Sequence, residues 1–324
     1  MVRKQTMDNF ITQLLFSASI TGPICLMLFL GVILKRIRLI NDNFIEVASK
    51  LVFQVTLPAM LFLSIVNADH DFSSSSRLII YGLIANFGFF LFTTFSTKLI
   101  FKDKQDHGVI IQGGFRANTA IIALAYVANA YGESGIALAA IYVASTTVLY
   151  NIQAVIALTP KEEHNEKQAF GVIIKTLTKN PLIIAILLGV VCSFLSVPIP
   201  DMVTQAGQYF ANMTLPLALL CAGGSLNLNS MKQDKGPTWF ATSYKLILSP
   251  LFITIGGILL GFRGLDLGLL FFMSAAPTAA ASYVMARAMG GNAILAANII
   301  AQTTVASLVT CTLGIFILSS FSLI

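Results

Sequence analysis

Residues 54–63, QVTLPAMLFL, and residues 212–221, NMTLPLALLC, each carry Thr-Leu-Pro in the middle of an apolar run. Proline inside a helix removes a backbone hydrogen bond and clashes with the preceding turn, so this tripeptide is expected to bend or break a helix. The two copies begin at Thr56 and Thr214, which lie 158 positions apart. A helix-breaking tripeptide that occurs twice at this distance suggests an internal duplication.

The composition places most of the chain in lipid. Of the 324 residues, 56% are hydrophobic and only 10% are charged, and the mean hydropathy is +0.82. Soluble proteins have about a quarter of their residues charged. The four cysteines lie in apolar segments without disulfide or metal spacing, so we expect small buried hydrophobes, with no metal site and no cofactor.

Ten apolar segments are long enough to cross a bilayer, which needs about 20 residues of helix. They lie near 17–36, 44–66, 77–101, 107–131, 133–158, 181–199, 202–226, 239–262, 264–288 and 292–320. The predicted fold is therefore an all-α polytopic membrane protein. Its expected parts are a five-helix repeat at 1–158, a polar linker at 159–180 and a second five-helix repeat at 181–324.

Shifting the chain by 158 positions aligns further residues of the two halves. The aligned pairs include Pro23 with Pro181, Gly31 with Gly189, Gly132 with Gly290 and Thr146 with Thr304. Because five crossings are an odd number, the second repeat would enter the membrane inverted. Inverted repeats with interrupted helices are typical of secondary transporters, whose substrate site lies near the midplane where the repeats meet.

Lysine and arginine fall unevenly on the two sides that this topology defines. One side collects Lys35, Arg36, Arg38, Lys98, Lys102, Lys104, Lys161, Lys167, Lys175, Lys179, Lys232 and Lys235, and the other collects Arg3, Lys4, Arg77 and Arg263. The positive-inside rule makes the richer side cytoplasmic. We therefore expect a cell-membrane protein with a cytoplasmic linker and both termini outside. The basic pI near 9.2 reflects this topology, and no nucleic-acid partner is expected.

The polar content of two segments indicates where a substrate would bind. Residues 107–132 read HGVIIQGGFRANTAIIALAYVANAYG, and their polar cluster lies roughly 14 Å from the segment's start, near the middle of an apolar core of about 30 Å. Paired glycines permit unwinding there, and Pro277 interrupts the corresponding part of residues 271–286, FFMSAAPTAAASYVMA. Two broken helices meeting at mid-depth would direct N–H groups and positive half-helix ends at an anion.

The candidate residues follow from this interpretation. Expected substrate contacts are Gln112, Arg116, Asn118, Thr119, Pro277, Ser282, Asn298, Gln302 and Thr303, and expected hinges are Pro58, Pro216, Gly113 and Gly114.

Each candidate has a structural alternative. Arg116 could snorkel toward the cytoplasm or neutralise helix C-terminal carbonyls instead of binding substrate. Asn298, Gln302 and Thr303 could join helices by hydrogen bonds. Lys50 and Lys245 lie about six residues from cytoplasmic helix ends, and we expect both to snorkel.

The positions of the acidic residues and the lack of enzyme motifs limit the classes of function that the sequence allows. All fourteen Asp and Glu residues lie in loops or near helix ends, so none is placed to carry a proton at mid-depth. The chain has no Walker loop, zincin pair or nucleophile elbow, and we do not expect an enzyme.

Three stretches give the chain a family resemblance: SKLVFQVTLPAMLF at 49–62, GFRANTAIIALA at 114–125 and AAPTAAASYVMARAMGGN at 275–292. In order and spacing it resembles the auxin efflux carrier family, which contains plant PIN carriers and bacterial organic-acid transporters. The resemblance implies a fold similar to bile-acid symporters and NhaA-type antiporters, with crossover helices in segments four and nine. It also implies that Asn118 contacts substrate. The chain departs from the family pattern at Ala125, where members often have proline, and at Ala279, Ala280 and Ala281, where polar residues are frequent.

The resulting prediction is a ten-helix secondary carrier for small organic anions, such as malate, malonate or auxin-like acids. Segments 1, 2, 6 and 7 would form a scaffold, and segments 3–5 and 8–10 would move. One alternative is a sodium- or proton-coupled antiporter or symporter of the NhaA type, and another is a non-transporting receptor or scaffold. The coupling ion, Na⁺ or H⁺, and formation of a homodimer are left open.

Overall fold

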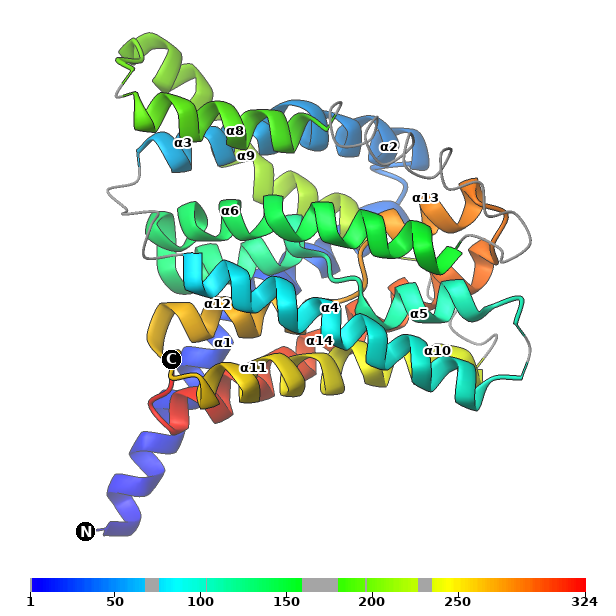
Figure 1. Cartoon of the computed structure of the whole chain (residues 1–324). Helices are drawn as coiled ribbons and strands as arrows, with labels where there is room; N and C mark the ends of the chain where they lie inside the picture. Colours follow the sequence, from blue (N-terminus) through cyan, green and yellow to red (C-terminus); the bar gives the residue numbers. More distant parts are fainter. Residues whose placement is uncertain (1, 68–75, 103, 159–179, 196, 227–234) are drawn as a thin grey trace. The chain divides into compact units, whose positions relative to one another are not determined.

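The computed structural model describes residues 2–67, 76–102, 104–158, 180–195, 197–226 and 235–324 (Figure 1). Helices account for nearly all of this part of the chain, and it contains no strand beyond one isolated β-bridge. Six helical spans are long and apolar enough to cross a membrane: Leu15–Arg36, Asp42–Val66, Ser76–Ile100, Thr119–Leu158, Gly236–Leu259 and Ala293–Ser320. The all-α, membrane-spanning prediction is confirmed, whereas the ten-helix inverted repeat stays a prediction.

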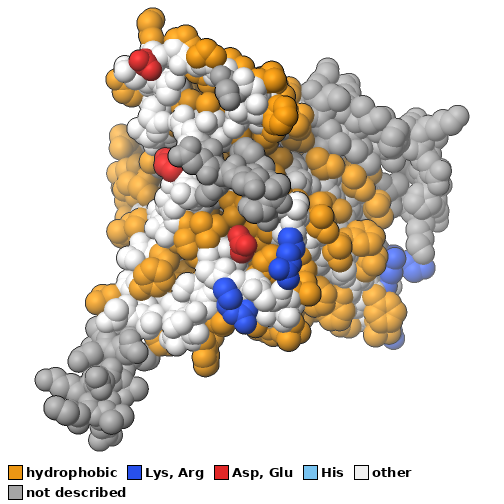
Figure 2. Space-filling model, turned by 60° about the vertical axis from the view of Figure 1, so that its left-hand side comes forward, with side chains coloured by type: hydrophobic (Ala, Val, Ile, Leu, Met, Phe, Trp, Pro, Cys, Tyr) orange, Lys and Arg blue, Asp and Glu red, His pale blue; other side chains and the backbone are white. Residues whose placement is uncertain are grey.

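Large apolar side chains cover much of the described surface. Phe95, Leu99, Phe194, Leu259 and Phe321 are all exposed. Figure 2 shows hydrophobic side chains spread over the described parts of one face, with few charged ones among them. Apolar surface of this extent is unfavourable in water and suits contact with lipid chains.

The chain forms two compact units, and each draws on both halves of the sequence. The first unit contains Met1–Leu26, Ile84–Ala130 and Asn227–Ile324, and the second contains Met27–Leu83 and Tyr131–Leu226. The division into a scaffold and a moving part stays a prediction. In the two units, segment 133–158 groups with 44–66 and 181–226, and segments 17–36 and 77–101 are each divided between the units. Gly132 has a positive φ of 60°, which ends the preceding helical turn and separates 133–158 from residues 107–131.

In the second unit, α3 (Leu57–Val66) packs against α8 (Pro181–Phe194) and α9 (Asp201–Gly224). The end of α1 (Val2–Arg36) lies so close to α9 that a Cβ at Gly31 would collide with the Leu220 carbonyl oxygen. A Cβ at Gly223 would likewise collide with the Leu28 carbonyl oxygen. Glycine is required at both positions because the two backbones touch.

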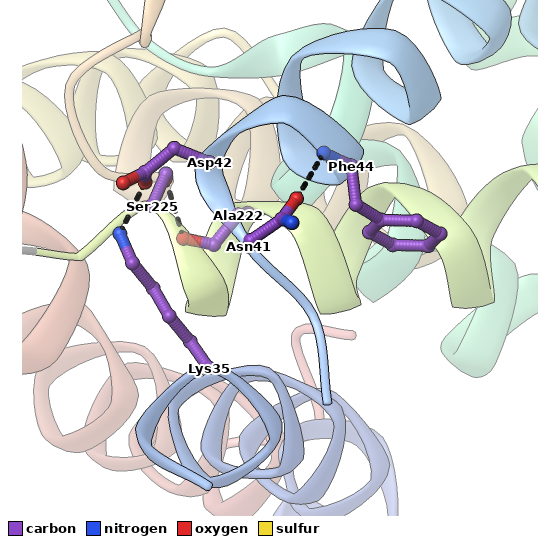
Figure 3. Close-up of polar contacts among 6 residues, drawn as sticks. All are labelled: Lys35, Asn41, Asp42, Phe44, Ala222 and Ser225. Atoms are coloured by element: carbon purple, nitrogen blue, oxygen red, sulfur yellow. Dashed lines mark hydrogen bonds and ion pairs between the residues drawn. The ribbon is translucent and has the colours of Figure 1, made fainter. Parts of the chain in front are cut away.

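Helix α2 (Asp42–Leu51) begins at a polar cap beside the end of α1 (Figure 3). The Asn41 side-chain oxygen accepts a hydrogen bond from Phe44 N at 2.9 Å, which satisfies a free N–H of the first turn. Lys35 Nζ lies 2.6 Å from Asp42 Oδ1. Asp42 is favourably placed at the positive end of α2, and Lys35 at the negative end of α1. These contacts fix the turn between the first two helices.

The two Thr-Leu-Pro copies have different local structures. A π-helical turn, η1 (Val52–Thr56), precedes Pro58, and Leu57 N donates to Val52 O, so the helix widens ahead of the proline. Pro216 instead lies inside the single helix α9. The same device as at Pro58 occurs before Pro250, where η5 (Tyr244–Leu248) connects α10 (Lys235–Ser243) to α11 (Ser249–Leu259). The hinge role of Pro58 and Pro216 stays a prediction.

In the first unit, α5 (His107–Phe115) packs against α10, α13 (Ala281–Ala288) and α14 (Ala293–Ser320), as Figure 1 shows. Aromatic rings join α4 (Ser76–Ile100) to these helices. Phe92 stacks on Tyr244 with ring centroids 5.6 Å apart, and Phe90 meets Phe115 edge to face at 5.1 Å. These contacts fix the place of the end of α5 among the neighbouring helices, and with it the start of the residues that follow.

Candidate substrate site

Two helices of the first unit are interrupted where the sequence predicts breaks. Helix α5 ends at Phe115, the backbone is extended at Arg116, and helical structure resumes in η2 (Thr119–Ala123) and α6 (Leu124–Leu158). Helix α12 (Gly264–Ala275) ends before the extended residue Ala276, and α13 begins at Ala281. Pro277 explains the second break because it has no N–H to continue the helix.

The two extended segments pair with each other. Ala117 and Thr278 form an isolated antiparallel bridge. Asn118 N donates to Pro277 O at 2.7 Å, and Ala279 N donates to Arg116 O at 3.1 Å. We call residues 116–118 and 276–280 the crossing. Its mutual hydrogen bonds satisfy backbone groups that would be costly to leave unpaired within a membrane.

Thr278 connects the crossing to its surroundings. Its hydroxyl donates to the carbonyl of Gly113 at 2.7 Å, and its N–H donates to Thr303 Oγ1 at 3.1 Å. Thr303 in turn donates to Ile299 O at 2.7 Å within α14. Residues from α5, α14 and the second broken helix are therefore held together through one threonine that the sequence analysis did not select. In the sequence, its position next to Pro277 is what marks Thr278 as a candidate.

The predicted hinge glycines have a packing role. Both lie within α5, and neither has a positive φ. A Cβ at Gly113 would lie 2.9 Å from Ile299 Cγ2, and one at Gly114 would lie 2.9 Å from Thr93 Cγ2. The absence of side chains lets α5 approach α14 and α4 closely. The hinge role of Gly113 and Gly114 stays a prediction.

Arg116 is buried, with 6% of its surface exposed. Both polar atoms of the Gln112 amide have hydrogen-bond partners when its oxygen faces the guanidinium of Arg116. It then accepts from Arg116 Nη1 at 3.1 Å, and its nitrogen donates to Ser282 O at 3.2 Å. The guanidinium also lies against the Met285 sulfur. Arg116 thus does not snorkel to the surface, and its contacts connect the end of α5 to α13.

Two further candidates are buried with unsatisfied polar atoms. Asn298 has no exposed surface, and neither its side-chain oxygen nor its nitrogen has a hydrogen-bond partner among the described residues. The hydroxyl oxygen of Ser282, at the start of α13, is also buried and has no hydrogen-bond partner among the described residues. Buried polar groups without partners are costly, by about 1–3 kcal/mol each. Such groups are suited to binding a ligand.

The remaining candidates differ in how they relate to the crossing. Asn118 and Pro277 form it through their backbones, and Thr303 contacts it through Thr278. Thr119 and Gln302 are buried. No described side-chain hydrogen bond joins either of them to the crossing.

The snorkelling prediction was wrong for Lys245. This residue lies in η5, has no exposed surface, and donates through Nζ to the carbonyl of Ser274 in the last turn of α12. Packing of α5, α12 and α14 around η5 encloses the side chain, so it cannot reach the membrane surface. Lys50, by contrast, is exposed and pairs with Glu46 at 2.7 Å, as a snorkelling side chain would.

The charges around the crossing favour an anion. Two buried cationic residues, Arg116 and Lys245, lie in this unit, and no carboxylate side chain is buried within the described ranges. Helical structure restarts at Thr119 and Ala281, and the N-terminal end of a helix carries a partial positive charge. Positive half-helix ends, amide and hydroxyl groups and buried cations are the groups that bind carboxylates.

Comparison with known proteins agrees with a membrane-transport role. A family model described as membrane transport protein matches residues 21–315. An uncharacterized transporter of Methanothermobacter thermautotrophicus is 22% identical over 290 residues, which cover 89% of this chain and 93% of the relative. The uncharacterized transporter YfdV of Escherichia coli K12 is 23% identical over 299 residues, which cover 90% of this chain and 92% of the relative. The similarity therefore extends over nearly the whole length of each protein.

Proposed function

Because the chain belongs to the auxin efflux carrier family of membrane transport proteins, we propose that it is a secondary carrier for small organic anions. The substrate class is monocarboxylates or dicarboxylates, such as malate, malonate or auxin-like acids. The carrier alternates access around the crossing, with Arg116 and Asn118 as the principal substrate contacts. Gln112, Thr119, Ser282, Asn298, Gln302 and Thr303 supply further polar groups.

The observation that carries this proposal is the antiparallel pairing of two interrupted helices beside a buried arginine. Asn118 N and Ala279 N each bond to a carbonyl of the opposite segment, and the guanidinium of Arg116 lies next to both Gln112 and α13. Broken helices inside a membrane serve to present backbone groups to a substrate or ion. A buried arginine there favours a substrate with negative charge.

The proposed carrier has ten transmembrane helices in two inverted repeats, with both termini outside the cell and residues 159–180 in the cytoplasm. Two similarities support the repeat. Gly132 and Gly290, which the 158-residue shift aligns, both have positive φ, at 60° and 75°. Thr146 and Thr304, also aligned, both donate to the carbonyl four residues earlier. The residues 159–179 of the linker lie outside the described part of the chain.

Transport of the anion could be coupled to a cation that binds in the same unit. The unsatisfied oxygens of Asn298 and Ser282 are of the kind that bind sodium or other hard cations. Coupling to sodium would make the protein a symporter or antiporter in place of a uniporter, with Arg116 and Asn118 still the principal anion contacts.

Purified protein in proteoliposomes tests the proposal. Uptake of radiolabelled malate, malonate and indole-3-acetate would be measured under an imposed voltage, a proton gradient or a sodium gradient, with protein-free liposomes as control. Saturable uptake of at least one acid is expected. If none of the acids is taken up while a sodium or proton flux is observed, the cation-antiporter alternative replaces the proposal.

A further inference from the structure

Lys245 has no assigned part in substrate binding, yet it is among the largest fully buried side chains of the described chain. It is the only buried lysine in the described part of the chain, where Lys35 is half-buried and Lys50, Lys98, Lys102 and Lys104 are exposed. A buried charge is costly unless it is compensated. No described carboxylate lies within ion-pair distance of its Nζ, and its hydrogen-bond acceptor is the Ser274 carbonyl.

The Ser274 carbonyl needs a donor because of the break in the helix. In a continuous helix it would accept from the N–H of residue 278. Here the Thr278 N–H donates to Thr303 Oγ1 instead, and Pro277 has no N–H to offer. The ammonium of Lys245 occupies the place of the missing backbone donor. It therefore stabilises the last turn of α12 at the position where the crossing begins.

The first broken helix has the same arrangement with a neutral donor. The crossing pairs Ala117 with Thr278, residues that are 161 positions apart, and the same separation relates Gly113 to Ser274. The Gly113 carbonyl accepts from the Thr278 hydroxyl, and the Ser274 carbonyl accepts from Lys245. Equivalent carbonyls are thus satisfied by a hydroxyl in one helix and by an ammonium in the other. A hydrogen bond alone would not require the charge.

We infer that Lys245 is a positioning residue of the crossing, which fixes the end of α12 and supplies a positive charge that selects anionic over neutral substrates. The C-terminal end of a helix carries partial negative charge, which would otherwise repel a carboxylate bound at the crossing. Lys245 neutralises that end. The inference rests on the proposed function, since it specifies how the same site recognises charge.

Three variants separate the hydrogen bond from the charge. Lys245→Arg keeps both, Lys245→Gln keeps a donor without the charge, and Lys245→Met removes both. Lys50→Met is the matched control, because Lys50 also lies in an apolar helix but is exposed and paired with Glu46. None of these changes replaces Arg116, Asn118 or a residue of the crossing.

The first readout is hydrogen–deuterium exchange of peptides covering 276–282 in ligand-free protein. We expect exchange to be at least about fivefold faster in Lys245→Met than in wild type, and unchanged in Lys245→Arg and Lys50→Met. The second readout is the affinity ratio between an acid and its neutral amide, measured with malonate and malonamide and with indole-3-acetate and indole-3-acetamide. We expect the preference for the acid to fall about tenfold in both Lys245→Gln and Lys245→Met, and to be retained in Lys245→Arg.

The two readouts also separate this inference from the proposed function. If wild-type protein binds none of the acids, the proposed substrate class fails, while the exchange result still decides the positioning role. If wild type prefers the acids and Lys245→Met retains both the preference and slow exchange, the inference on Lys245 fails alone. A change in exchange without a change in preference contradicts the charge role. Should neither uncharged variant fold, retention of the acid preference by Lys245→Arg supports the inference and its loss contradicts it.

Discussion

The hydroxyl of Thr278 donates to the carbonyl of Gly113 at 2.7 Å, and this bond connects the broken helix α12–α13 to the last turn of α5. Both residues are buried, so the bond is shielded from solvent. The backbone N–H of the same threonine donates to Thr303, so one residue joins three helical elements at the crossing. Stability of the crossing should accordingly depend on Thr278 more than on other threonines of the unit.

Replacing Thr278 with valine tests this dependence. Thr278→Val keeps the shape of the side chain but leaves the Gly113 carbonyl without its donor, at an expected cost of about 1–3 kcal/mol in the free energy of unfolding. Thr310→Val is the control, because Thr310 bonds only to carbonyls of its own helix. Thermal unfolding of the two purified variants should show a clear loss for Thr278→Val alone. Equal melting temperatures would contradict the bridging role.

Close packing at Gly113 gives a second prediction. Gly113→Ala places a Cβ 2.9 Å from Ile299 Cγ2, so α5 and α14 must move apart, at an expected cost of about 1–3 kcal/mol. Gly236→Ala is the control, since no atom lies within 4 Å of its added Cβ and alanine favours the helix. Thermal unfolding should show a lower melting temperature only for Gly113→Ala. A partial recovery in Gly113→Ala combined with Ile299→Ala would identify the Ile299 contact as the cause.

Much of the fold is predictable from the sequence because it depends on local properties. Hydropathy locates the helices, and Pro277 locates the second break, since proline acts on its own backbone. The paired glycines only mark the neighbourhood of the first break, because they lie within α5 and allow close packing. The 158-residue shift does not give the pairing at the crossing, where Ala117 meets Thr278 at a separation of 161. The two separations differ by three residues, and aligning the two halves without gaps cannot reveal such a difference between apolar segments.

The errors at the site have a common physical origin. Lys245 was predicted to snorkel because it lies near a predicted helix end, but the direction of a side chain depends on the helices packed around it. The hydrogen bond of the Thr278 hydroxyl likewise depends on a tertiary contact, since its acceptor lies in α5. The burial of Arg116 could be anticipated only as one of two alternatives, because a snorkelling arginine and a buried one have the same sequence signature.

The orientation in the membrane is testable through the linker. A single cysteine at Glu163, on a background with the four native cysteines replaced, should react with a membrane-impermeant thiol reagent only after cells are opened. The expectation rests on the excess of lysine and arginine on this side of the chain. A cysteine at Arg263, on the opposite predicted side, is the control and should react in intact cells. Labelling of the Glu163 position in intact cells would reverse the proposed topology.

Energy coupling gives a fourth prediction. Because no carboxylate is buried among the described residues, we expect voltage to drive anion uptake without a required proton gradient. Malonate uptake into proteoliposomes should increase when the interior is made positive and should persist when the pH is equal on both sides. Uphill uptake that requires a proton gradient at zero voltage would contradict this expectation.

The central claim is that an organic anion binds at the crossing through Arg116 and Asn118. Loss of a charge-assisted bond in Arg116→Gln should weaken binding by about 2 kcal/mol, or about thirtyfold. Arg116→Lys should lose less, because it keeps the charge without the planar fork. Asn118→Ala should cost nearer to 1 kcal/mol through loss of a neutral hydrogen bond.

The most direct measurement determines anion affinity and melting temperature on the same purified samples of wild type, Arg116→Gln and Asn118→Ala, with Lys50→Gln as a control for loss of positive charge. The account predicts weaker binding in both site variants, with melting temperatures close to wild type for Asn118→Ala and binding unchanged in Lys50→Gln. If Arg116→Gln lowers only the melting temperature and both site variants bind the anion as tightly as wild type, Arg116 is a structural clamp and the anion binds elsewhere.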